Sequence, residues 1–372
     1  MGSATFARTR YDDLYTTHYA GRGPVTRTAE TQAMRTGTLN PLVDPAGHGV
    51  IRRSLPRFDD LESGMHRLTI GMPMSVETRV DTTGSMGGNV DVAMRVLPDA
   101  YELASSLLPG FDLQMAIGIF GDVQDRFALC RAQFEMETDK LVESLSLMVP
   151  LRDGGDAPED PHYGLFGAAY LTDARINQYG LRRYDFTVSD APAHNRFQID
   201  QLLRIYGDEV FNKVVENGYQ LNRDDLPSIA DVVRVLLEKA HAFYLQVGHS
   251  TRTEAFWAEI FGDERVVLLP STELLPHVQA VIIGLTEGTL ALDTTLDFLV
   301  ENGVGDRDAD AITRSVANIP IGAQVPLREG LELPVAGDIF REKTDLWPID
   351  PRELDDDALV GAEPTSDGPN WL

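Results

Sequence analysis

The stretch MSVETRVDTTGSMGG (residues 74–88) decides the fold. Its first seven residues form a short β-prone run that ends at Asp81, and apolar residues recur at helical spacing from about Asn89 to Leu108. A glycine-rich turn with carboxylate and hydroxyl groups therefore lies between a predicted strand and a predicted helix. Pro98 falls inside the helical stretch, so we expect that helix to kink or to break in two.

The rest of the chain continues this alternation. Further strands are predicted at 112–120, 182–190, 241–248 and 266–270. Further helices are predicted at 137–148, 164–176, 227–240 and 274–288. Such alternation is typical of a parallel sheet covered by helices on both faces. The predicted fold class is therefore α/β, a doubly wound and mainly parallel sheet of about six strands with N- and C-terminal extensions.

The predicted organisation has four parts. Residues 1–69 are rich in Gly, Thr, Arg and Pro and are expected to form an extended N-terminal arm. Residues 70–290 are expected to form the α/β domain, with an insertion near 196–226. Residues 291–348 are predicted to be a small C-terminal helical extension, and residues 349–372 an acidic, flexible tail.

Composition limits the function classes. The chain has 372 residues, a formal net charge of −26 and a single cysteine, Cys130. So acidic a chain is a poor match for nucleic acid or for an anionic membrane, because both need a basic face. One cysteine cannot form an internal disulfide, and no apolar run reaches the length of about 18 residues that a membrane span needs. We therefore expect a soluble, cytoplasmic protein with no nucleic-acid or membrane partner.

Carboxylates and hydroxyls follow three of the predicted strands and loops. Ligands of open parallel sheets bind where the strands end. Asp81, Thr83 and Ser85 are spaced so that a turn can bring one carboxylate and two hydroxyls to one side, while Asp156 and Asp190 would approach from neighbouring loops, directly or through water. Oxygen-only ligands favour Mg²⁺, with Ca²⁺ or Mn²⁺ as alternatives, and one coordination position can stay open to an outside oxygen.

These residues carry a resemblance to a known family. DTTGSM (81–86) resembles the D-x-S/T-x-S motif of the von Willebrand factor A (vWA) domain, whose metal-ion-dependent adhesion site (MIDAS) has this composition. The resemblance covers roughly residues 70–290 and also includes GIFGDVQD (118–125), GGDAPED (154–160), FTVSDAP (186–192), and YLQVG (244–248) followed by FWAEIFG (256–262). The GGD-x-PE loop is similar to a vWA subgroup that includes hemicentin-like and alpha-kinase-associated domains.

Two positions depart from the family pattern. Thr83 stands where many members have Ser, which preserves the hydroxyl. In the second loop the family usually presents Thr, whereas this chain offers Asp156, with Asp153 as the less favoured substitute. A third carboxylate would leave the site negatively charged with its metal bound. We expect this charge to tighten metal binding and to weaken the need for an acidic ligand group.

The resemblance implies a function that is not enzymatic. It implies metal-dependent recognition of another protein, whose carboxylate or other oxygen completes the metal shell, in an adaptor or scaffold role. Bacterial and intracellular vWA proteins often serve assemblies with ATPases, kinases or phosphatases, and nothing in this chain selects among them. The alternative is a structural subunit with an internal or vestigial metal site. A metal-dependent hydrolase is the least favoured reading.

Three further residues lie near the predicted site. Asp122 is expected to have a structural or metal-supporting role, and Glu159 to pair locally or to cap the following helix. His194 follows the third loop and is more often a structural group in such a position. Ser85, His194 and Asp190 could suggest a nucleophilic triad, but the order fits poorly and there is no G-x-S-x-G elbow.

Overall fold

The computed structural model describes residue 9 and residues 27–47, 49–97, 99–150 and 158–346. Its centre is a six-stranded sheet in the order β10-β9-β8-β4-β5-β6. The strands are β4 (Pro73–Asp81), β5 (Asp112–Phe120), β6 (Leu129–Arg131), β8 (Arg183–Ser189), β9 (Ala240–Val247) and β10 (Val266–Leu269). Only β6 pairs antiparallel within this sheet. The predicted α/β class, with a doubly wound and mainly parallel sheet, is confirmed.

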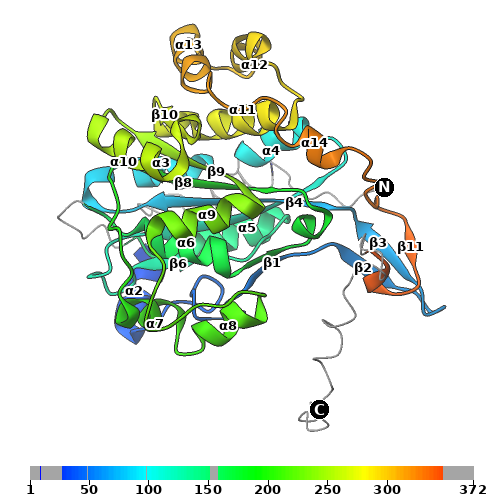
Figure 1. Ribbon diagram of the computed structural model, residues 1–372, viewed down its shortest axis with the longest axis horizontal. Coiled ribbons are helices and arrows are strands. Elements are labelled where there is room, and N and C mark those ends of the chain that lie inside the picture. Colours follow the sequence, from blue (N-terminus) through cyan, green and yellow to red (C-terminus); the bar gives the residue numbers. More distant parts are fainter. Residues whose placement is uncertain (1–8, 10–26, 48, 98, 151–157, 347–372) are drawn as a thin grey trace.

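Helices cover both faces of the sheet (Figure 1). One core lies under α3 (Asn89–Val96), α4 (Asp99–Leu107), α5 (Thr138–Ser146) and α11 (Leu275–Glu287). The other lies under α6 (Pro161–Tyr170), α9 (Ile229–Lys239) and α10 (Thr251–Phe261). Successive strand residues alternate between the cores, since Tyr244 belongs to the second and Leu245 to the first. None of the described helices is long and apolar enough to cross a membrane.

Local sequence signals explain where several helices start and stop. The predicted helix at 89–108 is broken as expected, because α3 ends at Val96 and α4 begins at Asp99. Ser228 caps α9 through its hydroxyl, which accepts from the backbone N–H of Asp231 at 3.2 Å. Ser250 caps α10 in the same way, accepting from the N–H of Thr253 at 3.2 Å.

One predicted helix is right in its first part and wrong in its second. The segment 164–176 was expected to be helical, but α6 ends at Tyr170, and β7 (Thr172–Ala174) and a 3₁₀ turn follow. The reason is a distant partner: β7 pairs in parallel with β1 (Arg52–Ser54), which local periodicity cannot reveal. The short β6 escaped prediction because three residues carry no readable pattern.

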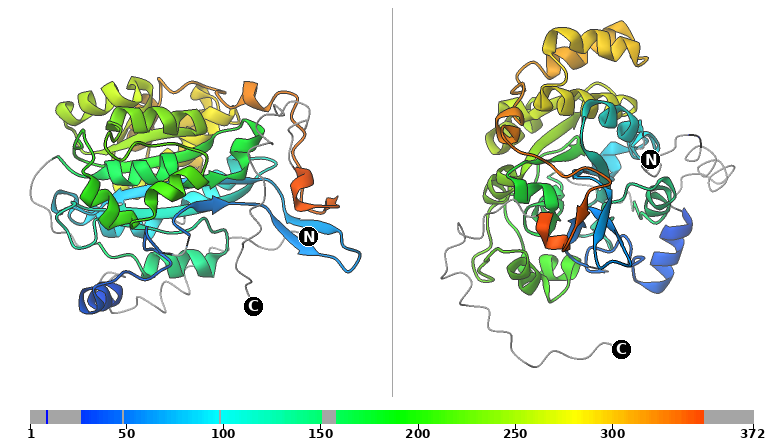
Figure 2. Two further views of the ribbon diagram at one scale, coloured as in Figure 1. Left: turned by 60° about the horizontal axis from the view of Figure 1, so that its bottom comes forward. Right: turned by 90° about the vertical axis from the view of Figure 1, so that its right-hand side faces the viewer.

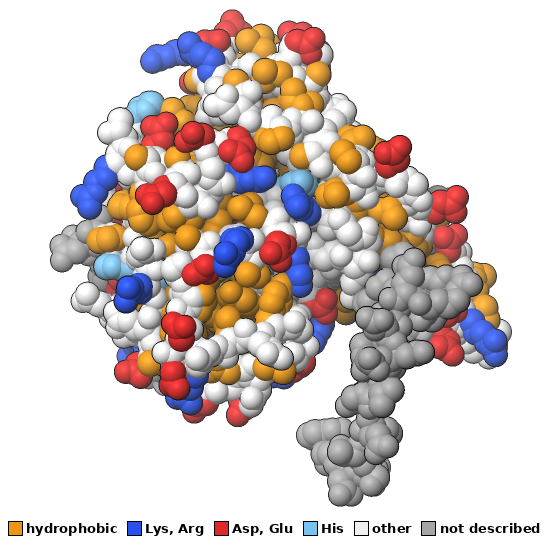
Figure 3. Space-filling model, viewed as in Figure 1, with side chains coloured by type: hydrophobic (Ala, Val, Ile, Leu, Met, Phe, Trp, Pro, Cys, Tyr) orange, Lys and Arg blue, Asp and Glu red, His pale blue; other side chains and the backbone are white. Residues whose placement is uncertain are grey.

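The chain outside the main sheet adds further elements. They are α2 (Arg27–Thr36), β2 (Arg57–Asp60), β3 (His66–Ile70), α7 (Ile199–Tyr206), α8 (Val210–Glu216), α12 (Thr295–Glu301), α13 (Asp306–Ser315), α14 (Val325–Arg328) and β11 (Ile339–Phe340). The β2–β3 hairpin and β11 form a small sheet that projects at one end of the molecule (Figure 2). Because β3 leads directly into β4, that end is the one where β4 begins, opposite the end that carries Asp81. Charged and apolar side chains are interspersed over the face in Figure 3.

The middle of the sheet buries a network of charges. Arg79 donates to both oxygens of Asp185, at 3.0 Å from its Nη1, and Arg183 Nη1 donates to the same carboxylate at 3.1 Å. Arg131 donates to the two oxygens of Glu77 at 2.7 and 3.0 Å. None of these five side chains is more than 1% exposed. Each buried carboxylate in this network therefore faces a guanidinium group.

Candidate metal centre

The candidate site lies where the strand order reverses. In the chain β5 follows β4 and pairs on one side of it, whereas β8 comes later and pairs on the other side. Such a switch point leaves a crevice at the carboxyl ends of the strands, where open α/β sheets bind ligands. Asp81 is the last residue of β4, and Asp190 directly follows the last residue of β8. Parallel pairing of these strands brings their ends to one edge of the sheet.

The structure brings four of the predicted site residues together. Asp81 is fully buried, and its Oδ1 accepts from the backbone N–H of Thr83 at 2.8 Å and from the Thr83 hydroxyl at 2.7 Å. Its Oδ2 accepts from the Ser189 hydroxyl at 2.6 Å. The Thr83 and Ser85 hydroxyl oxygens lie 3.3 Å apart. Ser85 in turn donates to Asp190 Oδ1 at 2.8 Å, so the four side chains form a continuous polar chain.

The buried carboxylate of Asp81 has no cationic partner among the described residues. Within the described ranges, no Lys, Arg or His side chain forms an ion pair with Asp81 or Asp190. Burial raises the pKa of Asp81 to about 6, and the nearby Asp190 adds a repulsive contribution. Hydrogen bonds from Ser189 and Thr83 oppose that rise without cancelling it. Asp81 is thus a buried acid without a positive partner in the described part of the chain.

Glu159 brings a second buried carboxyl group to the same edge, hydrogen-bonded to the Asp122 and Thr83 side chains. Its backbone N–H donates to Pro192 O at 2.9 Å, and its carbonyl accepts from the N–H of His194 at 3.1 Å, which ties the second loop to the third. The side chain is only 4% exposed, and its Oε2 has no hydrogen-bond partner. Burial, with the neighbouring Asp122 and Asp81 carboxylates, raises the pKa of Glu159 to about 9.

Glu159 was expected to pair locally or to cap the following helix, and only the second of these is wrong, since its side chain pairs with Asp122 and Thr83. The residue at the N-cap of α6 is Asp160, and it makes no side-chain capping bond. Asp160 Oδ2 instead accepts from the backbone N–H of Val123 at 2.8 Å, so the start of α6 is held against the loop that contains Asp122. The Glu159 side chain is buried, and the sequence alone does not show which acids of this loop are buried.

The geometry does not form a nucleophilic triad. Ser85 donates directly to the carboxylate of Asp190, whereas a triad needs a histidine between them. His194 is exposed, and its ring lies edge-on to the buried ring of His162 at 6.4 Å between centroids. No hydrogen bond that involves the described atoms joins His194 to Ser85.

Two predicted candidates cannot be placed. Asp156 and its less favoured substitute Asp153 lie outside the described residues, so their part in a metal shell stays a prediction.

The described donor set fits a hard divalent cation. Asp81 and Asp190 offer carboxylates, Thr83 and Ser85 offer hydroxyls, and Glu159 holds an orphaned buried oxygen nearby. Oxygen donors of this kind suit Mg²⁺, Ca²⁺ or Mn²⁺. Across the described part of the chain, no three His, Cys, Asp or Glu side chains converge as a ready ligand set, so hydroxyls would have to supply part of the shell.

Comparison with known proteins gives only distant likenesses. No family model matches the chain, and no curated protein sequence matches it. One similar solved structure is proximal thread matrix protein 1 (PTMP1) from the mussel byssus with a zinc occupied MIDAS motif, at 11% identity and a TM-score of 0.38, covering 58% of this chain and 46% of that one. Another is the vWF domain of the type V pili tip protein Mfa5 from Porphyromonas gingivalis, at 10% identity and a TM-score of 0.39, covering 57% of this chain and 95% of that one.

The chain therefore spans less than half the length of the mussel protein that it matches. Both TM-scores lie below 0.5.

Proposed function

We propose that residues 70–290 form a vWA-like domain whose MIDAS-like metal site recognises another protein, in an adaptor or scaffold role. The observation that carries this proposal is Asp81, a fully buried carboxylate with no cationic partner among the described residues. It is joined through hydroxyls to a second carboxylate at the switch point of the sheet. A divalent cation would balance both charges. An unpaired buried charge is costly, so a site of this composition favours an ion from outside.

Asp81, Thr83, Ser85 and Asp190 would hold the ion, directly or through water, and Asp156 is proposed to join them from the second loop. We propose Mg²⁺, with Ca²⁺ or Mn²⁺ as alternatives, because every described donor is oxygen. When bound, the ion supplies a positively charged position that accepts an oxygen ligand from outside.

The approach to the site suits a protein partner. Ser85 is exposed, as are Gly84, Gly87 and Gly88 around it, so side chains do not crowd the turn on its outer side. A carboxylate or another oxygen of the partner could reach the ion there and complete its shell. Among the described residues, no histidine is hydrogen-bonded to the Ser85 or Thr83 hydroxyl, and the proposal is therefore recognition rather than catalysis.

The test is a pull-down of cellular partners by the full chain, carried out in Mg²⁺ and repeated in EDTA. We expect the wild-type chain to retain partners in Mg²⁺ and to release them in EDTA. The Asp81→Asn variant should not retain these partners in either condition. Asp297→Asn, which removes an exposed carboxylate on α12, is the matched control and should behave as wild type.

Two results would contradict the proposal. Partners that stay bound in EDTA and to Asp81→Asn would favour a structural subunit with an internal or vestigial site. Turnover of phosphoesters or peptides that Asp81→Ala abolishes would favour a metal-dependent hydrolase.

A further inference from the structure

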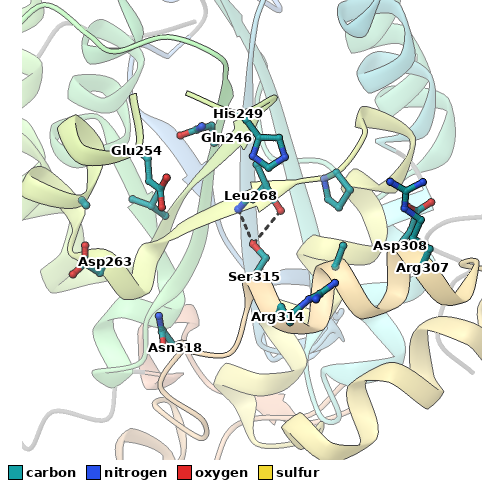
Figure 4. A pocket seen from close by; sticks show the side chains of 14 residues that line it. Gln246, His249, Glu254, Asp263, Leu268, Arg307, Asp308, Arg314, Ser315 and Asn318 are labelled. Atoms are coloured by element: carbon teal, nitrogen blue, oxygen red, sulfur yellow. Dashed lines mark hydrogen bonds between the residues drawn. The ribbon is translucent and has the colours of Figure 1, made fainter. Parts of the chain in front are cut away.

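A polar groove of about 860 Å³ opens beside the metal centre, between α10 and α13 and over the ends of β9 and β10 (Figure 4). Gln246 lies on its floor and is the register partner of Ser189, the residue before Asp190. Neighbouring strands are about 4.8 Å apart, so the groove begins one strand away from the loop after β8 that carries Asp190. Thr253 in the first turn of α10 also donates to the carbonyl of Asp190 at 3.3 Å. This hydrogen bond connects α10, which forms one wall of the groove, directly to the loop that carries Asp190.

Gln246 has an unsatisfied acceptor at this groove. Its side chain is 3% exposed, and its Nε2 donates to the carbonyls of Gly248 and Ser250, both at 3.2 Å. Because these two carbonyls require a donor, they fix the orientation of the amide. The Oε1 atom is left buried without a hydrogen-bond partner. A ligand that brings an N–H group to this atom would satisfy it.

The wall that includes Gln246 is acidic. Glu254 on α10 and Asp263 in the turn after it line the same side of the groove, and neither forms an ion pair with a described residue. Both side chains are exposed, so a ligand can reach them. This side therefore offers one buried amide oxygen and two carboxylates as acceptors, beside the imidazole of His249.

The opposite wall does not cancel this charge. It is formed by α13 and carries Arg307, Asp308 and Arg314 (Figure 4). Arg314 is already paired with Asp310 at 2.5 Å. The groove lining thus has the carboxylates of Glu254, Asp263 and Asp308 against the guanidinium groups of Arg307 and Arg314, which leaves one negative charge in excess.

We propose that this groove binds a basic side chain, arginine in preference to lysine, of the same partner whose oxygen completes the metal shell. The planar guanidinium group has five N–H donors and can serve the amide oxygen and the carboxylates together. This inference rests on the proposed function for the identity of the partner. Because the groove residues are not metal ligands, the groove can be tested separately from the metal site. The proposed recognition element is a short segment with an acidic residue for the metal and a basic residue for the groove.

The test is selection of peptides by the full chain from a displayed library that has one fixed aspartate and randomised neighbours. Selections in Mg²⁺ and in EDTA run in parallel. We expect a pool that depends on Mg²⁺ and carries arginine or lysine at a constant offset from the aspartate. Replacing that arginine in a selected peptide with citrulline, which keeps the shape and removes the charge, should weaken binding at least about tenfold.

The protein variants locate this preference in the groove. Glu254→Gln combined with Asp263→Asn should abolish the discrimination between arginine and citrulline, with Mg²⁺ affinity unchanged. Glu259→Gln is the matched control, because it removes an exposed carboxylate from the same helix outside the groove.

Each other outcome overturns one of the two proposals or both. A pool that depends on Mg²⁺ but shows no basic preference overturns the groove and supports the proposed function. A basic preference equal in Mg²⁺ and EDTA supports the groove and contradicts metal-dependent recognition. Loss of discrimination in Glu259→Gln as large as in the double variant also overturns the groove, and a library with no binders in either condition overturns both.

Discussion

Strand β4 buries carboxylates at two places, and they differ in what faces them. In the middle of the strand, Glu77 accepts two hydrogen bonds from the Arg131 guanidinium, and nearby Asp185 is held by Arg79. At the end of the same strand, Asp81 is just as buried, but its described partners are hydroxyls and a backbone amide, with another carboxylate nearby. Burial of a carboxylate alone therefore does not indicate a metal site. The lack of a described counter-charge at Asp81 does indicate one.

The two regions also respond oppositely to added positive charge. The network in the middle already has three guanidinium groups for its two carboxylates, so it has no need of an outside ion. At the carboxyl ends of β4 and β8, Asp81 and Asp190 have no cationic partner among the described residues, and Ser85 is exposed to solvent there. Removing one partner of a buried pair leaves an uncompensated charge, whereas removing an unpaired buried charge relieves one.

The largest effect is expected from Glu77→Gln. This change leaves the buried guanidinium of Arg131 without a carboxylate, and we expect the free energy of unfolding to fall by about 3–5 kcal/mol. Urea unfolding measures it, with Asp297→Asn as a surface control that should stay within about 0.5 kcal/mol of wild type. A loss for Glu77→Gln as small as the control's would remove the contrast between the two regions.

Mg²⁺ should stabilise the folded protein through the edge alone. At a concentration about 100 times the dissociation constant, the ion is expected to add about 2.7 kcal/mol to the free energy of unfolding. Asp81→Asn should abolish this gain while changing the metal-free stability by no more than about 1 kcal/mol. Thermal unfolding with and without Mg²⁺ checks both parts, and an equal gain in the variant would place the ion elsewhere.

Acid should destabilise the protein partly through His162. Burial lowers the pKa of His162 to about 3, against an ordinary value of 6.5, so the unfolded chain binds a proton that the folded protein refuses. Stability from this group is therefore complete above about pH 6.5 and is lost as the pH falls towards 3. We expect about 2 kcal/mol of loss between pH 7 and pH 5.

His162→Phe should remove that part of the pH dependence, since the ring packs against Phe197 and Tyr163. His241 is also buried with its pKa lowered to about 4, so some acid sensitivity should remain. Urea midpoints at the two pH values give the comparison, and an unchanged slope in His162→Phe would show that the imidazole is charged in the folded protein.

The smallest effect is expected from Ser85→Ala. Ser85 is exposed, so the fold should be unaffected, but the loss of one ligand oxygen should weaken Mg²⁺ binding about tenfold. Ser106→Ala, at an exposed serine of α4, is the control and should leave Mg²⁺ affinity unchanged. Calorimetric titration distinguishes the two, and equal affinities would take Ser85 out of the metal shell.

Local patterns predict much of this fold because its main strands are apolar runs that end in turns. The strands at 74–80 and 112–120 and the helix break at Pro98 could be predicted from residue spacing alone. The meeting of Asp81 with Asp190 also follows from the sequence, since carboxyl ends of neighbouring parallel strands share an edge.

What could not be predicted depends on contacts between distant segments. Arg79 and Asp185 look like ordinary polar positions of alternating strands until the pairing of β4 with β8 places them side by side in the interior. The burial of Glu159 depends on its bridge to the loop after β8. The groove exists only because α13 folds back against β10, where the Ser315 hydroxyl bonds the backbone of Leu268.

Calorimetric titration of the metal-free chain with Mg²⁺, and with Mn²⁺ as a second probe, tests directly whether Asp81 and Asp190 hold a divalent cation. We predict one ion bound per chain, and no binding at this site in Asp81→Asn or Asp190→Asn. We also predict unchanged binding in Asp297→Asn. Absence of binding to the wild-type chain, or equal binding by the Asp81 variant, would contradict this prediction.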